Sequence, residues 1–143
     1  MIVGLGIDVA SIERIERAIA RFGSRFLARL LTEEERQMAE RKQHDRAQFV
    51  AGRLAAKEAS SKALGAPEGI GWHDVAVSRD ANGAPRLRFA GKALERAEVL
   101  CVTQSHLSIT HDAGVAAAVV VLEKAGIFEK STEPARTGAP SEG

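Results

Sequence analysis

Residues 52–65 read GRLAAKEASSKALG, and this stretch decides how the fold and the site are interpreted. Counted at about 100° per residue, Glu58 and Lys62 point the same way, and apolar residues occur on almost every side of the helix. A helix that is apolar all round is usually buried. The charged side chains of the stretch are therefore either paired within the protein or placed to meet a charged ligand.

The composition of the whole chain is that of an ordinary globular protein. Its 143 residues suit one domain with a core, 45% are hydrophobic, 27% are charged, and the formal net charge is +1. This charge gives no reason to expect binding to nucleic acid or to a membrane, so any electrostatic signal is local. The single cysteine, Cys101, excludes an internal disulfide framework and favours a reducing, cytoplasmic setting.

The segments before the long helix predict a strand and shorter helices. Residues 1–9 read as a strand in which Ile2, Gly4, Gly6 and Asp8 share one face. Ser11 can cap a helix over about 12–22, which ends at Gly23. The apolar stripe expected on this helix consists of Ile12, Ile15, Ile19 and Phe22.

Two capping patterns define the next helices. Thr32 with Glu35 forms a capping box for a helix over about 33–42. Asp45 with Gln48 is a comparable start for the long helix, over about 46–64. Gly65 then stands where a C-terminal glycine is expected.

The second half of the chain predicts hairpins. Asn82-Gly83 is a strong turn signal between two short apolar runs, and a helix of about ten residues follows from Lys92. Residues 106–112 and 114–124 read as a closing strand pair. The predicted fold is α+β, with an antiparallel sheet packed on a long helix. We expect one domain over residues 1–124 and a disordered tail over 125–143, which is rich in Gly, Pro, Ser and Thr.

Two carboxylates are candidates for a metal site. Asp8 closes a glycine-spaced strand, but it also precedes a helix whose N-terminus favours an acid. Glu58 can form an i,i+4 salt bridge with Lys62, or it can be buried and need a cation. Together they could hold a Mg²⁺ that takes further ligands from phosphates, with Lys62 as a point charge on the same phosphates. Spacing along the chain does not determine whether Asp8 and Glu58 meet.

Two further features are open to a structural or a functional interpretation. His111 shares a strand face with Leu107 and Ile109, as a structural histidine would, and it lies where the turn begins. Residues 11–30 hold five arginines against two glutamates, and Arg14, Arg17 and Arg21 recur at helical spacing. This basic ridge is either a solvated helix face or a dock for an acidic partner.

Three segments in the same order carry a family resemblance: GLGIDV at 4–9, FVAGRLAAKEASSKALG at 49–65 and HLSITHD at 106–112. They resemble the bacterial holo-[acyl-carrier-protein] synthases, the small 4'-phosphopantetheinyl transferases of fatty acid biosynthesis. The resemblance implies that a serine of apo acyl carrier protein attacks the β-phosphate of coenzyme A, which gives holo acyl carrier protein and 3',5'-ADP. It also implies a homotrimer with active sites shared between neighbouring subunits.

The resemblance also implies roles for individual residues. Asp8 and Glu58 match the ligands of a catalytic Mg²⁺, and the base is Glu58 or a water held by the metal. The residues that match the coenzyme A site are Arg53, Lys62, Gly65 and His111. The residues that match the basic helix for the acidic carrier protein are Arg14, Arg17 and Arg21. Two other classes stay open on the residues alone: a binding module without catalysis, and a different magnesium-dependent nucleotide enzyme such as a hydrolase.

Overall fold

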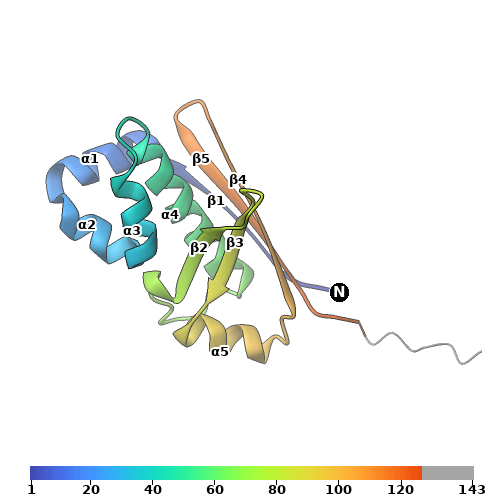
Figure 1. The fold of residues 1–143 in the computed structure, drawn as a ribbon. Helices are drawn as coiled ribbons and strands as arrows, with labels where there is room; N and C mark the ends of the chain where they lie inside the picture. Colours follow the sequence, from blue (N-terminus) through green and yellow to red (C-terminus); the bar gives the residue numbers. More distant parts are fainter. Residues whose placement is uncertain (127–143) are drawn as a thin grey trace, which may run out of the picture.

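The first and last strands of the protein lie side by side. In the computed structural model, which describes residues 1–126, β1 (Ile2–Ser11) and β4 (Gln104–Asp112) both pair with β5 (Val115–Glu123). The three strands form an antiparallel sheet in the order β1-β5-β4, and α4 (Arg46–Ala63) packs across it (Figure 1). The predicted α+β class, with an antiparallel sheet on a long helix, is confirmed.

Two glycines bring β1 close to α4. A Cβ at Gly4 would lie 2.1 Å from the carbonyl oxygen of Ala63, and a Cβ at Gly6 would lie 1.8 Å from that of Ala59. Only glycine leaves room for the helix backbone at these positions. Gly4, Gly6 and Asp8 share a strand face, as predicted, so this approach also carries Asp8 to the side of α4. The prediction that Ile2 shares this face is wrong, because the register shifts between Ile2 and Gly4: Ile2 is 62% exposed and Val3 packs against the core instead.

Three short helices precede α4: α1 (Ile12–Phe22), α2 (Ser24–Leu30) and α3 (Glu33–Glu40). The Ser11 side chain accepts a hydrogen bond from the backbone N–H of Arg14 (3.2 Å), which caps α1 as predicted. The capping box of Thr32 and Glu35 is also present. The third helix ends at Glu40, two residues earlier than predicted.

Two local predictions about these helices are wrong. Phe22 was expected on the buried stripe of α1, but it is 53% exposed, because it is the last residue before the chain turns into α2. Asp45 makes no side-chain capping bond to α4. Gln48, its expected partner, instead places Nε2 at 3.1 Å from Nε2 of His111 on β4.

The Asn82-Gly83 hairpin forms a second, two-stranded sheet from β2 (Val75–Arg79) and β3 (Pro85–Phe89). The carboxylate of Asp80 accepts the backbone N–H groups of Asn82 and Ala84, and Gly83 has a φ of 81°. A short 3₁₀ helix, η1 (Trp72–Asp74), leads into this hairpin, and α5 (Gly91–Val99) follows it. The predicted turn and the helix after it are confirmed.

On β1 and β5, one face of the three-stranded sheet is apolar, and no described residue covers it, whereas β4 adds the polar residues His106, Ser108 and Thr110 to the same face. Helices α1–α4 lie on the other side of this sheet (Figure 1). Leu5, Ile7 and Val9 are 59–65% exposed, and they stand opposite partly exposed residues of β5. We call this surface the outer sheet face; it consists of Leu5, Ile7, Val9, Ala117, Val119 and Val121.

No helix within residues 1–126 is long and apolar enough to cross a membrane. Of the predicted tail, residues 127–143 lie outside the part of the chain that the structure describes. The first tail residue, Ala125, donates its backbone N–H to Oγ1 of Thr103 at 2.8 Å.

Candidate active site

The two candidate carboxylates meet in space. Asp8 comes from β1 and Glu58 from the middle of α4, and both line a cavity of about 310 Å³. Arg14 of α1 and Leu54 of α4 are among the other residues of its wall. The question that spacing along the chain left open is therefore answered by the packing of β1 on α4.

The two carboxylates of this cavity share one nearby lysine, Lys62. Burial, and then the negative charge of Asp8, raise the pKa of Glu58, while Lys62 acts in the opposite direction. Lys62 forms its ion pair with Asp8, at 3.1 Å between Nζ and Oδ1, and not the i,i+4 pair with Glu58 that the sequence allows. Glu58 is thus a half-buried carboxylate that a further cation would stabilise.

The donor set of the cavity suits Mg²⁺. Carboxylate oxygens are the hard ligands that Mg²⁺ prefers, and the ion is often held by only one or two carboxylates together with waters and phosphates. Among residues 1–126 there is no group of three or more His, Cys, Asp and Glu side chains that could hold a metal alone. Asp8 and Glu58 therefore fit an ion that takes its remaining ligands from a phosphate-bearing substrate.

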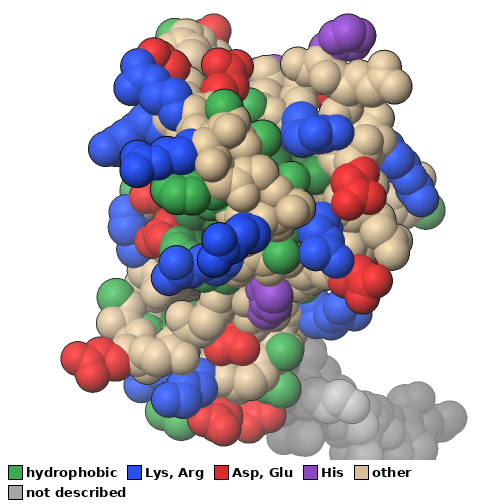
Figure 2. All heavy atoms as spheres, turned by 90° about the vertical axis from the view of Figure 1, so that its left-hand side faces the viewer, with side chains coloured by type: hydrophobic (Ala, Val, Ile, Leu, Met, Phe, Trp, Pro, Cys, Tyr) green, Lys and Arg blue, Asp and Glu red, His purple; other side chains and the backbone are tan. Residues whose placement is uncertain are grey.

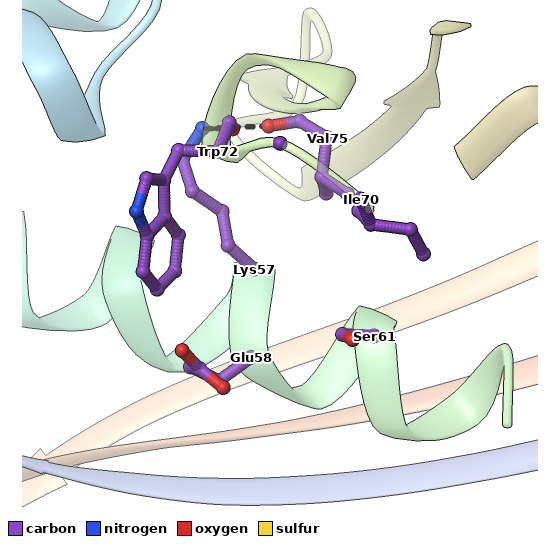
Figure 3. Close-up of a pocket in the computed structure, with 7 residues that line it drawn as sticks. Lys57, Glu58, Ser61, Ile70, Trp72 and Val75 are labelled. Carbon is purple, nitrogen blue, oxygen red and sulfur yellow. Dashed lines mark hydrogen bonds between the residues drawn. The ribbon is translucent and has the colours of Figure 1, made fainter. Parts of the chain in front are cut away.

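Glu58 also lines a second cavity, of about 140 Å³ (Figure 3). Ser61 lines it from α4, and Trp72 lines it from η1, with the indole pointing toward α4 beside the Glu58 carboxylate. Neither residue was singled out from the sequence. Trp72 is the only tryptophan of the chain, and Ser61 stands inside the KEASSK segment, so both carried a signal that could have been used.

Lys57, the neighbour of Glu58, also lines the second cavity, but its ammonium is paired within the protein. Its ammonium lies 2.8 Å from Oε1 of Glu35, and both side chains are 1% exposed. Among the charged side chains of residues 52–65, that of Lys57 is therefore paired within the protein.

Arg53 and His111 lie together in a third cavity, of about 170 Å³, which Phe49 and Arg79 also line. The Arg53 guanidinium stacks 4.1 Å from the centroid of the Phe49 ring, and the residue is 2% exposed. Burial, and then the charge of Arg79, lower the pKa of Arg53 to about 10, although Glu35 acts in the opposite direction. Nε and Nη2 of Arg53 are buried and have no hydrogen-bond partner among the described residues, so they are donors that an anion bound beside Arg53 would satisfy.

The predicted coenzyme A residues are thus divided within one chain. Lys62 stands with Asp8 near Glu58, whereas Arg53 and His111 stand together in the third cavity. Gly65 follows α4 with a φ of 88°, beside the guanidinium of Arg96.

The three predicted arginines of α1 have different neighbours. Arg14 lines the cavity of the two carboxylates, Arg17 pairs with Glu13, and Arg21 stacks on Phe22. The basic surface continues onto α2, which carries Arg25 and Arg29, the other two arginines of residues 11–30. Lys and Arg side chains stand among hydrophobic ones on the side of the molecule that carries α1 and α2 (Figure 2). An open cavity of about 510 Å³ there is lined by Phe22, Arg25, Phe26 and Arg29.

Comparison with known proteins gives a consistent result. Residues 4–120 match the family described as the 4'-phosphopantetheinyl transferase superfamily. The chain is 48% identical over 126 residues to the holo-[acyl-carrier-protein] synthase of Maridesulfovibrio salexigens, which covers 87% of this chain and 100% of that one. The holo-[acyl-carrier-protein] synthase of Solidesulfovibrio magneticus is 50% identical over 125 residues, with 86% and 99% covered.

Solved structures agree with these relatives. The structure of Helicobacter pylori holo-[acyl-carrier-protein] synthase in complex with coenzyme A has a TM-score of 0.72 and 36% identity, and covers 83% of this chain and 99% of that one. The same TM-score, with 40% identity and coverage of 87% and 99%, is found for a holo-(acyl-carrier-protein) synthase from Bacillus anthracis, a complex described as containing CoA (3',5'-ADP).

Proposed function

The chain belongs to the 4'-phosphopantetheinyl transferase superfamily, and we propose that it performs the reaction of its holo-[acyl-carrier-protein] synthase relatives with a Mg²⁺ held by Asp8 and Glu58. The reaction transfers the 4'-phosphopantetheine group from coenzyme A to a serine of apo acyl carrier protein and gives the holo protein and 3',5'-ADP. The observation that carries the proposed site is the single cavity that Asp8 and Glu58 line together.

In the proposed reaction Glu58 accepts the proton of the serine hydroxyl, and the serine oxygen forms a bond to the β-phosphorus of coenzyme A. The bond between this phosphorus and the 3',5'-ADP oxygen breaks, so the electron pair leaves with 3',5'-ADP. A bound Mg²⁺ supplies charge neutralisation for the pyrophosphate, which is the main requirement of phosphoryl transfer.

Lys62 and Arg53 serve as phosphate partners in this proposal. The Lys62 side chain is 52% exposed, so its ion pair with Asp8 is weak and its ammonium can turn to a bound phosphate. The free donors of Arg53 suit a second anionic group of the same substrate. His111 stands beside Arg53, and Gly65 lets the chain turn sharply after α4.

We further propose that the protein is a homotrimer in which one coenzyme A contacts two subunits. Two features support this assembly. The outer sheet face is apolar and uncovered, as expected of a surface that packs on another copy. The division of the coenzyme A residues between two cavities is also accounted for if Arg53 and His111 serve the carboxylate site of a neighbour.

The acidic carrier protein would approach the basic side of α1. Arg14 borders the carboxylate cavity, so a carrier protein on this helix would have its serine near the pyrophosphate. Arg21 extends the same ridge, and Arg17, whose charge is shared with Glu13, contributes less. We place the reaction in fatty acid biosynthesis in the cytoplasm, a setting that agrees with a chain of one cysteine.

Mass spectrometry of apo carrier protein tests this function. After incubation with the enzyme, coenzyme A and magnesium, the carrier protein should gain the mass of one phosphopantetheine, and it should gain nothing without magnesium. Consumption of coenzyme A in the absence of carrier protein would instead indicate a hydrolase. Salt-sensitive binding of the carrier protein with no mass gain would indicate a module without catalysis.

A further inference from the structure

The pair of Glu35 and Lys57 is the most deeply buried pair of opposite charges among the described residues. Burying a carboxylate and an ammonium is unfavourable unless both are fully hydrogen-bonded. Apolar side chains of the same size often hold elements together as well or better. The directed hydrogen bonds of the pair are therefore the feature that needs an explanation.

Lys57 uses its ammonium group to hold one particular segment. Besides Glu35, Nζ donates to the carbonyl oxygen of Trp72 at 2.9 Å and to that of Val75 at 2.6 Å. Because an ammonium has three N–H groups, these contacts account for all of its donors. The Lys57 side chain rises from α4 to these carbonyls (Figure 3).

Glu35 holds the same segment from the side of α3. Its Oε2 accepts the backbone N–H of Val77 at 3.0 Å, and its Oε1 accepts that of Thr32 at 2.8 Å as well as Lys57. The pair thus attaches η1 and the start of β2 to both α3 and α4. Side-chain groups make these attachments, so a substitution can remove them without changing the backbone.

The attached segment is a wall of the cavity that Glu58 lines. Trp72 and Val75 line that cavity opposite α4, and Trp72 also lines the neighbouring apolar cavity of about 320 Å³ with Phe26 and Leu54. On α4, Lys57 anchors the wall, and the next residue, Glu58, faces the space that the wall encloses. A shift of the segment would change the width of this space directly.

We propose that the Glu35–Lys57 pair is a positioning device for coenzyme A: it fixes the Trp72–Val75 wall at the distance from Glu58 that the phosphopantetheine end of the substrate requires. The inference rests on the proposed function, in which coenzyme A binds at Glu58, and it extends that site to the second cavity, which Glu58 also lines. Glu35 and Lys57 are positioning residues, because the ammonium of Lys57 and the carboxylate of Glu35 are engaged with each other and with backbone groups, although the side chain of Lys57 also lines the cavity.

The test removes both charges together and observes the wall directly. In the full chain, Glu35→Leu with Lys57→Met leaves no unpaired buried charge. Trp72, the only tryptophan, reports on the wall through acrylamide quenching of its fluorescence. We expect stronger quenching in the folded variant and an increase of about tenfold in KM for coenzyme A, since small misplacements of a binding group are costly. The KM for carrier protein should stay unchanged.

The matched control is the exposed pair of Asp80 and Arg86, which lie 2.9 Å apart on the hairpin of β2 and β3. Asp80→Ala with Arg86→Met should change neither Trp72 quenching nor the KM for coenzyme A. Wild-type quenching and wild-type KM in the Glu35→Leu, Lys57→Met variant would overturn the proposal and leave the pair as packing only.

If the double variant does not fold, a measurement on the wild-type protein still tests the proposal. Saturating coenzyme A should reduce the quenching of Trp72, because the substrate fills the cavity that Trp72 lines; unchanged quenching would overturn the proposal. Trp72 quenching in the Glu35→Leu, Lys57→Met variant without coenzyme A does not depend on catalysis. A failure of the proposed function would appear separately, as the absence of phosphopantetheine transfer by the wild-type protein.

Discussion

Nζ of Lys62 lies 3.1 Å from Oδ1 of Asp8, and it also donates to the carbonyl oxygen of Ile7 at 3.0 Å. These contacts join the last turn of α4 to β1, the first strand of the chain. Lys62 is half exposed while the Asp8 side chain is 19% exposed, so the carboxylate is the better fixed partner. Asp8 is thus held in place, as its proposed role as a Mg²⁺ ligand requires, and Lys62 is the partner that can turn toward a phosphate in the proposed reaction.

The first prediction concerns the two carboxylates. Asp8→Asn and Glu58→Gln should each lower kcat/KM for phosphopantetheine transfer by about 10²-fold or more, because each removes a charged ligand of the proposed Mg²⁺. The free energy of unfolding should change by less than about 1 kcal/mol, since Lys62, the partner of Asp8, is half exposed and the pair is therefore weak. Transfer assays and chemical denaturation measure the two quantities. Near-normal turnover of either variant at saturating magnesium would contradict the metal site.

The second prediction concerns Arg53, whose stability and binding effects should have opposite signs. Arg53→Met keeps a long apolar side chain on Phe49 and removes two buried donor nitrogens that have no partner among the described residues. The variant should be as stable as the wild type or more stable by about 1 kcal/mol. Its KM for coenzyme A should rise, as measured with coenzyme A varied at saturating carrier protein. An unchanged KM would mean that the third cavity does not serve the substrate.

The third prediction concerns the basic ridge of α1. Arg14→Glu with Arg21→Glu should raise the KM for carrier protein about tenfold or more, because like charges would face each other across the interface. The KM for coenzyme A should stay nearly unchanged. Arg88→Glu, an exposed arginine on β3, is the control and should leave both constants as they are. A change confined to coenzyme A would show that the two arginines bind the nucleotide phosphates instead.

The fourth prediction concerns the outer sheet face. Leu5→Asp with Ile7→Asp should convert the proposed trimer to monomers, because burying two carboxylates in an interface is unfavourable. Sedimentation or light scattering reports the mass. The control is Val99→Asp at the end of α5, which is 69% exposed and lies outside this face. A trimer that survives the double substitution, or a wild-type protein that is already monomeric, would rule out this face as the interface.

The fifth prediction concerns the approach of β1 to α4. Gly6→Ala should lower the free energy of unfolding by at least about 3 kcal/mol, since its Cβ would stand 1.8 Å from the backbone oxygen of Ala59. Gly83→Ala is the matched control, because that Cβ meets nothing within 4 Å and the cost is only that of a positive φ, about 1 kcal/mol. Equal losses in denaturant midpoint would contradict the close packing of strand and helix.

The sequence by itself determined the local structure of this protein. Ser11 and the box of Thr32 and Glu35 begin their helices as predicted, and Asn82-Gly83 turns its hairpin, because each of these signals acts on backbone groups within a few residues. The period of two in β1 likewise predicted that Gly4, Gly6 and Asp8 would face the same way. The family was also readable, because its motifs are short segments in a constant order.

Only the tertiary structure decided which of these side chains meet. A buried face of a strand or helix can pack against several partners with similar apolar area, so periodicity identifies the face but not the neighbour. The packing of β1 on α4 brought Asp8 to Glu58 and gave Lys62 to Asp8 rather than to Glu58. The contact of α3 with α4 paired Lys57 with Glu35, 22 positions earlier in the printed sequence, and removed that lysine from the set of ligand-facing charges.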